Sequence, residues 1–383
     1  MNGRERINWA AQEMPVLASI RADFEARKPL IGMVIGACLH ITKETAVLLE
    51  TLQAGGATVF AAPSNPLSTQ NDVAETLCLE KIQVYGMHGA TPEQYHQGLL
   101  SVVKQHPRIV IDDGGDLTKF VHDQIIGERE QYTIGGLEET TTGVNVIKQM
   151  EKRGELRYPI LDVNGANTKH FFDNVYGTGQ SVIDAIMRST NQLLAGKTFV
   201  VAGYGYCGKG LAQRARGMGC IVIVTEVDSV KALQALMDGF EVMKMDDAAY
   251  IGDIFITVTG DRDVITAQHM IHMKHRAVLA NAGHFDVEIN IEDAKKFPNL
   301  ILLGEGRLVN LACAEGHPSS VMDMSFANQA LGVEYLLNKY KGMKPGVHEM
   351  PREIDEKVAR LKLEAFDVQI DELTQAQKEY LGL

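Results

Sequence analysis

The sequence predicts an α/β protein built from two doubly wound parallel-sheet domains, with a small helical segment at the C-terminus. Two observations carry this prediction. Over the first 165 residues, apolar runs of strand length alternate with helical stretches, a spacing typical of a parallel sheet with helices on both faces. From residue 198 onward, a strand, a glycine-rich turn, a helix and a second strand follow in the order of a dinucleotide-binding unit.

The first series of elements lies between residues 30 and 163. We expect its strands in short apolar runs at residues 30–35, 58–62, 83–87, 108–111 and 158–163. We expect its helices at residues 43–53, 71–80, 92–105 and 144–153. Polar residues gather directly after several of these strands, and ligands of open α/β sheets bind at the carboxyl ends of strands.

The second series begins with a helix at residues 177–188, after a polar turn that contains glycine. Its strands are expected at residues 198–201, 221–224, 242–245, 254–257, 277–280 and 300–303. After Pro318 the chain turns helical at residues 325–339, and Pro345 breaks this pattern. The last 30 residues predict one or two helices and a short strand.

Composition and charge narrow the range of partners. The 383 residues carry a net charge of −12 and no long basic run, so we expect neither nucleic acid nor an anionic membrane surface as a main partner. No segment approaches the roughly 18 apolar residues of a membrane span, and the N-terminus lacks the apolar core of a signal peptide. The five cysteines are scattered, which predicts a reducing cytoplasm rather than a disulfide framework.

Residues 198–226 carry the clearest chemical signal. Gly203 is expected to make the tight turn, Gly205 to let the backbone approach a pyrophosphate, and Gly208 to let the helix pack closely on the strand. The N-terminus of that helix offers free N–H groups to phosphates. Glu226, after the next strand, is placed to accept hydrogen bonds from an adenosine ribose, which favours NAD over NADP. The alternative is a merely structural glycine turn.

Two acid–base candidates follow strands of the first series. His40 follows the strand that ends in GACLH, where a histidine is either catalytic or a polar group at a helix start. The run DDGGD follows the strand RIVI. Its carboxylates, on Asp112, Asp113 and Asp116, could bind a divalent metal, form a solvated turn or provide one buried base. The spacing matches no calcium loop, and we expect no metal.

Lys169 and Asp173 are four residues apart and would share a face of a helix. The simplest interpretation is a salt bridge. The functional interpretation is a lysine whose pKa is tuned to accept a hydroxyl proton. The run EETTT at residues 138–142 is interpreted as a helix cap, with threonines satisfying free N–H groups.

Histidines of the second series have two different interpretations. His284 follows the strand AVLANAG, and in a dinucleotide-binding fold this position lies beside the nicotinamide. His269, His272 and His275 are three residues apart and suggest zinc, but no cysteine or carboxylate completes the set. A surface helix explains their spacing better.

Taken together, these strings resemble S-adenosylhomocysteine hydrolases over most of the chain and in the order of that family. The matching strings are LHITKETAVLLETL (39–52), SNPLSTQNDVA (64–74), DDGGDLT (112–118), EETTTGV (138–144), NTKHFFDN (167–174), YGTGQS (176–181), VAGYGYCGKG (201–210), NAGHFDVEI (281–289) and GEGRLVNLACAEGHPSSVMDMSFANQAL (304–331). The wording of several strings is most similar to archaeal and thermophilic-bacterial members.

The resemblance implies reversible hydrolysis of S-adenosyl-L-homocysteine to adenosine and L-homocysteine. In that chemistry NAD oxidises the ribose 3′-hydroxyl, which acidifies the 4′ hydrogen; homocysteine is eliminated, water adds, and the hydride returns. Glu44 resembles the adenine-reading version of the family and favours the adenosyl substrate. S-inosyl-L-homocysteine or another nucleoside is the alternative substrate. A catalytically inactive NAD- or nucleoside-binding regulator is the alternative from another class.

The site residues that the resemblance implies fall into three groups. The catalytic group comprises Lys169, Asp173 and Glu139 at the 3′-hydroxyl, Asp113 as the base at the 4′ carbon, His40 with His284 at the leaving sulfur and water, and Asn174, which orients the set. The substrate-binding group comprises Thr42 and Glu44 at the adenine, together with Ser68, Gln70 and His317. The cofactor-binding group comprises Thr140, Thr141, Thr142, Gly203, Gly205, Gly208, Glu226, Asn281 and Asn310.

The resemblance also divides the chain. It implies a substrate-binding domain at residues 1–177, completed by about 318–345, an NAD-binding Rossmann domain at 178–317 and a C-terminal segment at 346–383. Hinges near Gly177 and His317 would let the domains close and exclude water. A homo-oligomer, either tetramer or dimer, is implied as well. Several features depart from the family pattern. Thr178 replaces a common cysteine, STQN replaces the commoner STQD, the segment 290–303 is shorter than usual, and the chain ends at Leu383 without a lysine- and tyrosine-bearing tail.

Overall fold

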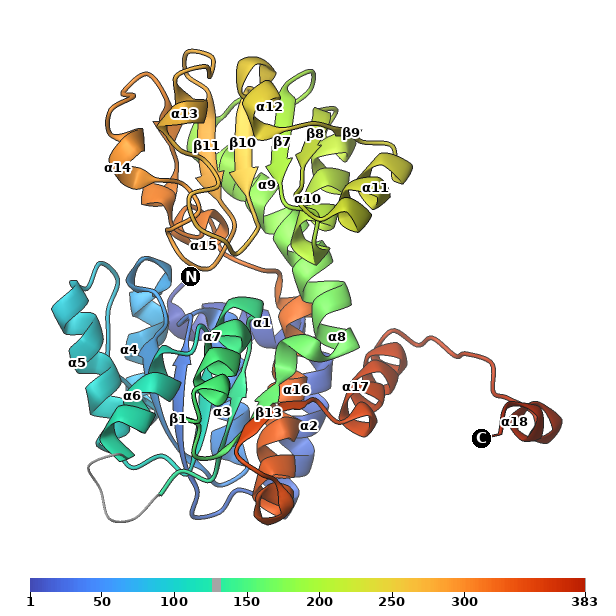
Figure 1. The fold of residues 1–383 in the computed structure, drawn as a ribbon. Helices are drawn as coiled ribbons and strands as arrows, with labels where there is room; N and C mark the ends of the chain where they lie inside the picture. The colour runs from blue at the N-terminus through green and yellow to red at the C-terminus, as the bar shows by residue number, and fades with distance from the viewer. Residues whose placement is uncertain (126–131, 383) are drawn as a thin grey trace.

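The computed structural model describes residues 1–125 and 132–382. Within these residues, each pair of neighbouring strands in the two sheets is parallel. Figure 1 shows two α/β bodies, one above the other, connected by a helical segment and by a returning stretch that leads into α16 (Ser319–Lys339). The predicted fold class is confirmed, with two parallel sheets and helices at the C-terminus.

The lower body in Figure 1 is built on a seven-stranded sheet with the order β13-β6-β5-β4-β1-β2-β3. Its strands are β1 (Val34–Leu39), β2 (Thr58–Pro63), β3 (Gln83–Val84), β4 (Ile109–Asp112), β5 (Gly135–Glu138), β6 (Pro159–Asp162) and β13 (Gly346–Glu349). The last strand comes from the C-terminal part of the chain. The first sheet therefore contains residues from both ends of the sequence.

Helices cover both faces of this sheet and bury its two apolar cores. One core is formed with α1 (Gly3–Gln12), α2 (Pro15–Arg27), α3 (Lys43–Ala54), α4 (Asn71–Leu79), α16 and α17 (Arg352–Ala365). The other is formed with α5 (Pro92–Val103), α6 (Asp116–Ile125) and α7 (Thr141–Lys152). This two-sided burial explains why β1 and β4 are almost continuously apolar.

The upper body is built on a six-stranded sheet with the order β12-β11-β10-β7-β8-β9. Its strands are β7 (Thr198–Ala202), β8 (Ile221–Thr225), β9 (Glu241–Val242), β10 (Ile254–Thr257), β11 (Val278–Asn281) and β12 (Ile301–Leu302). Its helices are α9 (Thr178–Thr190), α10 (Tyr206–Gly217), α11 (Ser229–Met237), α12 (Met245–Ile251), α13 (Ala267–Met270), α14 (Ile291–Ala294) and α15 (Val309–Ala312). Two apolar clusters, one on each side of the sheet, form its core.

The chain passes between the two bodies twice. It first leaves the lower body through α8 (Asn167–Lys169), a π-helical segment (His170–Gly177) and α9. It returns through the stretch before α16. The two crossings touch, because a Cβ atom on Gly177 would lie 2.8 Å from Nδ1 of His317.

Both sheets change direction at a strand whose carboxyl end carries predicted site residues. In the first sheet, β1 lies between β2 and β4, and in the second sheet, β7 lies between β8 and β10. Such switch points are where open α/β sheets bind ligands. His40 follows β1, Asp113 follows β4, and the glycine turn follows β7.

Some expected elements differ from the observed ones. The strand expected at 30–35 begins only at Val34, because the preceding residues form a turn in which Gly32 has φ +75°. The strand expected at 242–245 ends at Val242, and α12 begins at Met245. The short strand expected in the last 30 residues is wrong: residues 366–374 form neither helix nor strand, and β13 lies earlier.

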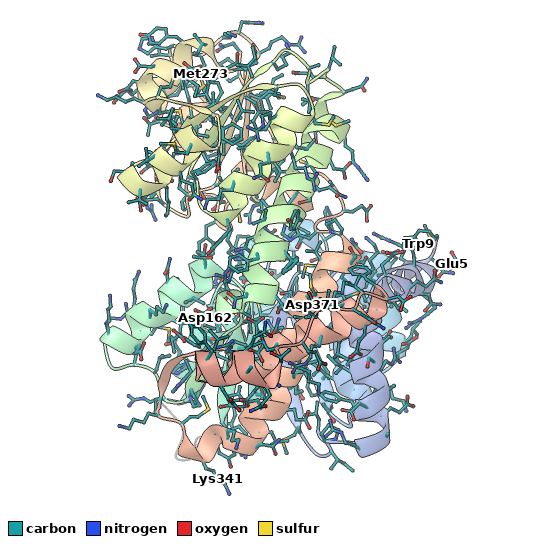
Figure 2. The ribbon with its side chains drawn as sticks, turned by 90° about the vertical axis from the view of Figure 1, so that its right-hand side faces the viewer. Glu5, Trp9, Asp162, Met273, Lys341 and Asp371 are labelled. Atoms are coloured by element: carbon teal, nitrogen blue, oxygen red, sulfur yellow. The ribbon has the colours of Figure 1, made fainter. Side chains whose placement is uncertain are left out.

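The C-terminal stretch projects away from the rest of the chain (Figure 1). It runs from Phe366 through an extended segment to α18 (Gln375–Leu381), and its large apolar side chains are exposed, with Ile370 at 69% and Tyr380 at 91%. Figure 2 views the molecule from the side on which this stretch, marked by Asp371, projects. Within the described residues, the structure contains no helix that is both long and apolar enough to span a bilayer.

Candidate active site

One large cavity lies between the two bodies and receives residues from both. Its volume is about 1140 Å³, and its walls include the residues after β1, β4 and β5, the π-helical segment, and the glycine turn after β7. Most of the predicted site residues line it: His40, Thr42, Glu44, Asp113, Glu139, Thr140, Thr141, Thr142, Lys169, Asp173, Asn174, Gly203, Gly205, Glu226, His284, Asn310 and His317. The cavity thus brings together side chains that are far apart in the sequence.

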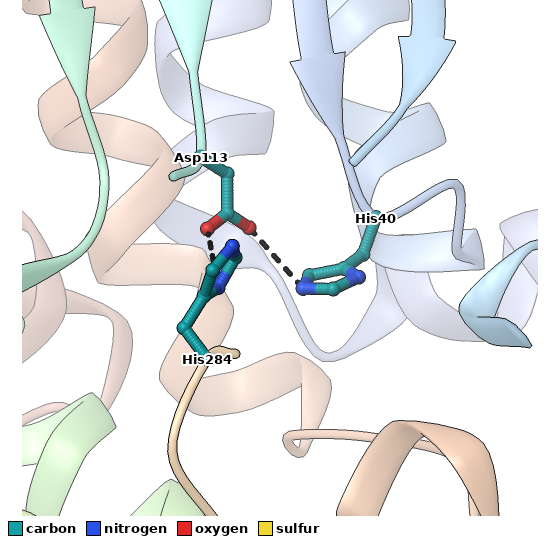
Figure 3. Close-up of side chains that lie close together, drawn as sticks. All are labelled: His40, Asp113 and His284. Carbon is teal, nitrogen blue, oxygen red and sulfur yellow. Dashed lines mark ion pairs between the residues drawn. The ribbon is translucent and has the colours of Figure 1, made fainter. Parts of the chain in front are cut away.

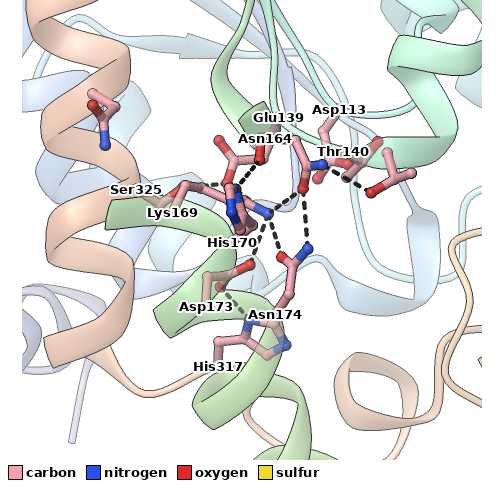
Figure 4. A network of polar contacts seen from close by, with 12 residues as sticks. Asp113, Glu139, Thr140, Asn164, Lys169, His170, Asp173, Asn174, His317 and Ser325 are labelled. Carbon is pink, nitrogen blue, oxygen red and sulfur yellow. Dashed lines mark hydrogen bonds and ion pairs between the residues drawn. The ribbon is translucent and has the colours of Figure 1, made fainter. Parts of the chain in front are cut away.

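Lys169 is the centre of a buried polar network in the cavity wall (Figure 4). Its Nζ lies 2.8 Å from Oδ2 of Asp173 and 3.6 Å from Oε1 of Glu139, and it donates a hydrogen bond of 2.9 Å to Oδ1 of Asn174. The predicted salt bridge is therefore present. The π-helical turn explains the convergence, because its wider spacing places residues four and five positions after Lys169 on the same side of the helix.

The charges in this network set its proton affinities. Burial alone would lower the pKa of Lys169, but Asp173 and Glu139 outweigh it and raise that pKa above its ordinary value. Burial would raise the pKa of Asp173, but His317 and Lys169 lower it below its usual range. Burial raises the pKa of Glu139, although Lys169 opposes this shift. A lysine with a lowered pKa, which direct acceptance of a hydroxyl proton requires, is thus not what these contacts produce.

Three further residues hold this network in place, and the sequence analysis did not identify them. Ser325 and Gln329, one turn apart on α16, donate hydrogen bonds to the two carboxylate oxygens of Glu139. Asp355 on α17 accepts hydrogen bonds of 2.8 Å from the backbone N–H groups of Asn167 and Thr168, at the start of the helix that carries Lys169. The available signal was the presence of polar residues inside an otherwise apolar helical pattern.

His40, Asp113 and His284 form a second set of side chains that line the cavity, with Asp113 between the two histidines (Figure 3). Nε2 of His40 lies 3.4 Å from Oδ2 of Asp113, and Nδ1 of His284 lies 3.4 Å from Oδ1. Ser68 contacts the other ring nitrogen of His40 at 2.6 Å. Burial lowers the pKa of His40 to about 4, although Asp113 opposes the shift, so this imidazole is neutral at pH 7.

The structure separates the three carboxylates of the DDGGD run. Asp112 accepts hydrogen bonds from backbone N–H groups of Asp113 and Thr118, and Asp116 accepts one from the Tyr95 hydroxyl. They do not converge, so a metal site built from this run is wrong. Among the described residues, ligand atoms of His40, Asp113 and His284 lie within 4.8 Å of one another, close enough to hold a metal ion. That no metal is required stays a prediction.

The other histidine interpretation needs a correction. Of the three histidines expected on one surface helix, only His269 lies on α13, which ends at Met270. His272 and His275 follow in turns. Within its own capping turn, Nδ1 of His269 accepts a hydrogen bond of 3.1 Å from the backbone N–H of Thr266.

The glycine turn has the shape of a phosphate cradle. Gly203 has φ +106°, and a Cβ atom on Gly208 would lie 2.1 Å from the Gly203 carbonyl oxygen, so the helix packs as closely as predicted. A Cβ atom on Gly205 would meet no described atom within 4 Å, so its backbone is open to the cavity. Gly205 is also the N-cap of α10, and no described side chain caps that helix.

Polar groups at the two ends of this cradle fit a dinucleotide. At the end of β8, the Glu226 carboxylate is fixed by the N–H groups of Tyr204 at 2.7 Å and Val227 at 2.7 Å, and it lines the cavity. Asn310 donates a hydrogen bond of 2.9 Å to Ser181. Its Oδ1 is buried and has no partner among residues 1–125 and 132–382, so it is available to an amide donor such as a nicotinamide carboxamide.

Four predicted site residues lie outside the described lining of the cavity. Gly208 acts through helix packing, and Ser68 lies behind His40. Gln70 accepts a hydrogen bond of 3.1 Å from the Lys43 backbone N–H and lines a separate shallow hollow. Asn281 is fully buried, and its amide bonds only the protein, including the carbonyls of Phe285 and Gly306. Asn281 therefore shapes the loop that carries His284, and its expected role as a cofactor contact stays a prediction.

The fold and the cavity define a class: a two-domain enzyme in which a dinucleotide-binding sheet faces a second sheet with buried acid–base groups. Comparisons with known proteins identify the family. Residues 1–135 match the family model described as S-adenosyl-L-homocysteine hydrolase, and residues 174–299 match that of its NAD binding domain. The chain belongs to the S-adenosyl-L-homocysteine hydrolase family, and its cofactor is NAD.

Full-length relatives support this assignment. The chain is 54% identical to an adenosylhomocysteinase of Aquifex aeolicus, covering 99% of this chain and 96% of the relative. It is 52% identical to an adenosylhomocysteinase of Saccharolobus solfataricus and 52% identical to an S-inosyl-L-homocysteine hydrolase of Methanocaldococcus jannaschii, each covering 99% of this chain and 95% of the relative. The resemblance deduced from the sequence motifs is confirmed.

Proposed function

We propose that this chain catalyses the reversible hydrolysis of S-adenosyl-L-homocysteine to adenosine and L-homocysteine. One observation carries the proposal: two separate acid–base sets, centred on Lys169 and on Asp113, share one cavity with the glycine turn. A simple dehydrogenase needs proton transfer at one hydroxyl only. A second set suits chemistry at the neighbouring carbons.

The Lys169 network is placed to handle the proton of the ribose 3′-hydroxyl. Bound NAD supplies reversible hydride transfer at the 3′ carbon. Since the pKa of Lys169 is raised and that of Glu139 is raised by burial, we infer that Lys169 passes a proton to Glu139 before it accepts the hydroxyl proton. Asp173 stays ionised and keeps the ammonium group oriented.

The second set is placed to act at the 4′ and 5′ carbons. Asp113 offers a carboxylate whose Oδ1 is buried and has no hydrogen bond within the described residues, which suits a base that removes the 4′ proton. His40 is neutral at pH 7 and can deprotonate the water that adds at the 5′ carbon. His284 lies on the opposite side of Asp113 and comes from the cofactor-binding sheet, so this set is complete only when the two bodies are close together.

Glu44 supports adenine as the purine. Its Oε1 accepts a hydrogen bond of 2.6 Å from the Ser319 hydroxyl, which fixes the carboxylate at the cavity wall. A carboxylate accepts a hydrogen bond from the 6-amino group of adenine, whereas the 6-oxo group of hypoxanthine would face it as a second acceptor. S-inosyl-L-homocysteine remains the second candidate substrate because a relative with that name is 52% identical to this chain.

We further propose the domain division and closure implied by the resemblance, with residues 1–177 and about 318–345 moving against 178–317. The contact between Gly177 and His317 supports a double hinge at these crossings. The exposed apolar C-terminal stretch supports a homo-oligomer, because a second copy would cover it. Five unpaired cysteines are consistent with a cytoplasmic protein.

The deciding experiment incubates the NAD-loaded protein with S-adenosyl-L-homocysteine and measures adenosine and free thiol. The comparison is kcat/KM for S-inosyl-L-homocysteine under the same conditions. Formation of both products with a preference for the adenosyl substrate is expected. Absence of product from the folded, NAD-loaded protein would contradict the proposal, and a strong preference for the inosyl substrate would contradict the role of Glu44.

A further inference from the structure

Two buried carboxyl groups lie next to the cavity but outside the predicted catalytic set. Asp112 ends β4 and Glu138 ends β5, and the parallel register places these two residues side by side. Both are fully buried. Each directly precedes a residue that lines the cavity, Asp113 in one strand and Glu139 in the other. The two buried acids can therefore influence the positions of Asp113 and Glu139 without lining the cavity themselves.

Glu138 connects the two loops that follow these strands. Its Oε1 accepts a hydrogen bond of 2.9 Å from the backbone N–H of Gly114, the residue after Asp113. The same oxygen accepts hydrogen bonds from the backbone N–H of Thr140 at 3.0 Å and from its hydroxyl at 2.9 Å. Thr140 in turn caps α7 and lines the cavity.

The surrounding backbone is shaped to admit this carboxyl group. Gly114 has φ +107°, a conformation that a glycine adopts without strain. A Cβ atom on Gly143 would lie 2.1 Å from Oε1 of Glu138, so a larger residue there would displace the carboxyl group. The position of Glu138 is thus fixed from both sides.

Asp112 completes the arrangement around Asp113. It accepts hydrogen bonds from the backbone N–H of Asp113 at 3.0 Å and of Thr118 at 2.7 Å. Burial, followed by the neighbouring acids Asp112 and Asp113, raises the pKa of Glu138 well above its ordinary range, and the backbone hydrogen bonds from Gly114 and Thr140 oppose this shift. Glu138 contacts both loops through hydrogen bonds to one carboxylate oxygen, so its contribution to their placement is hydrogen-bond geometry.

We propose that Glu138 is a positioning residue that fixes the loop of Asp113 relative to the cofactor-contacting loop of Thr140. This proposal rests on the proposed function, in which Asp113 removes the 4′ proton of a sugar held beside NAD. A shift of about 1 Å between reacting groups can cost on the order of 10²-fold in rate. Because both loops donate to the same oxygen of Glu138, this oxygen limits how far one loop can shift relative to the other.

The test compares Glu138→Gln, which keeps the shared acceptor oxygen in a neutral group, with Glu138→Ala, which removes it. Glu50→Ala is the matched control. Glu50 is also a buried glutamate of the lower body, but it contacts Arg4 and Arg21 instead of the two loops. Two quantities are measured in each folded variant: hydrogen exchange at the amides of Gly114 and Thr140, and solvent deuterium uptake at the 4′ carbon of adenosine.

We expect Glu138→Ala to speed exchange at both amides by about tenfold or more and to slow 4′ deuterium uptake by about tenfold or more. Glu50→Ala and Glu138→Gln should stay within about threefold of the unaltered protein in both measurements. Unchanged amide exchange in Glu138→Ala would overturn the proposal. A defect in Glu138→Gln as large as in Glu138→Ala would overturn it as well, because charge rather than geometry would then matter.

Amide exchange needs no turnover, so it tests positioning even if the unaltered protein fails to act on adenosine, an outcome that would refute the proposed function instead. If Glu138→Ala does not fold, Gly143→Ala probes the same geometry by displacing the carboxyl group. We expect it to speed exchange at the amides of Gly114 and Thr140. Normal exchange at both amides in folded Gly143→Ala would overturn the proposal.

Discussion

Replacement of Lys169 by methionine removes the buried cation between two carboxylates. Nζ of Lys169 lies 2.8 Å from Asp173 and 3.6 Å from Glu139, and all three residues are at most 5% exposed. Because the loss of one partner of a buried ion pair leaves an uncompensated charge, we expect Lys169→Met to lower the free energy of unfolding by about 3 kcal/mol. Loss of the proton-handling group should slow NAD reduction by adenosine by about 10²–10⁴-fold.

Lys362→Met is the control that separates stability from chemistry. Nζ of Lys362 lies 2.9 Å from Asp323, and this pair is as buried as that of Lys169 but lies outside the described cavity lining. Urea unfolding measures stability, and absorbance at the NADH band after adenosine addition measures the oxidation step. Lys362→Met should lose similar stability and reduce NAD within about threefold of the unaltered rate. The reasoning fails if Lys169→Met reduces NAD within about tenfold of that rate.

Three further predictions concern the other parts of the site. Asp113→Asn should spare NAD reduction but slow solvent deuterium uptake at the 4′ carbon by about 10²-fold or more; equal loss of both steps would contradict its role as the carbon base. Glu226→Ala removes the carboxylate at the end of the glycine turn and should raise the affinity for NADP relative to NAD by about tenfold, measured by titration of the stripped protein; an unchanged ratio would exclude Glu226 as the ribose ligand. His40 has a folded pKa of about 4, so the unfolded chain binds an extra proton as the pH falls from about 6.5 to 4, and stability should drop by up to about 3 kcal/mol in this window; His40→Gln should flatten that part of the stability curve, and an unchanged slope would refute the pKa assignment.

The parts of the site that the sequence predicts are those set by local spacing. The glycine turn is read directly from its spacing, and the structure shows the packing expected of Gly208. His40 and Asp113 were recognised because each follows an apolar strand. Their proximity, however, depends on the pairing of β1 with β4, two strands separated by β2 and β3 in the sequence.

Other features lay outside local patterns. The strand β5 (Gly135–Glu138) has the sequence GGLE, which contains none of the β-branched residues that mark a strand, and it forms only because β4 and β6 pair with it on both sides. The amino acids of the π-helical segment do not distinguish it from an ordinary α-helix. Sequence spacing could therefore suggest the pair of Lys169 and Asp173, but it could not place Asn174 in hydrogen-bond contact with Lys169. The hydrogen bonds of Asn281 also lie outside local spacing, because one of its acceptors, the Gly306 carbonyl, is 25 residues further along the chain.

The contacts of His317 join the proposed closure to the proposed proton transfer. His317 lies on the returning crossing, against Gly177 of the first crossing, and its Nδ1 lies 2.5 Å from Oδ1 of Asp173. Of the groups around Asp173, His317 lowers the pKa of this carboxyl group most, and Lys169 lowers it next. A hinge movement that withdrew His317 would therefore raise the pKa of Asp173 and let it compete with Glu139 for the proton of Lys169. We infer that the low pKa of Asp173 belongs to the proposed closed arrangement, in which His284 also lies beside Asp113, and that closure would therefore prepare both acid–base sets together.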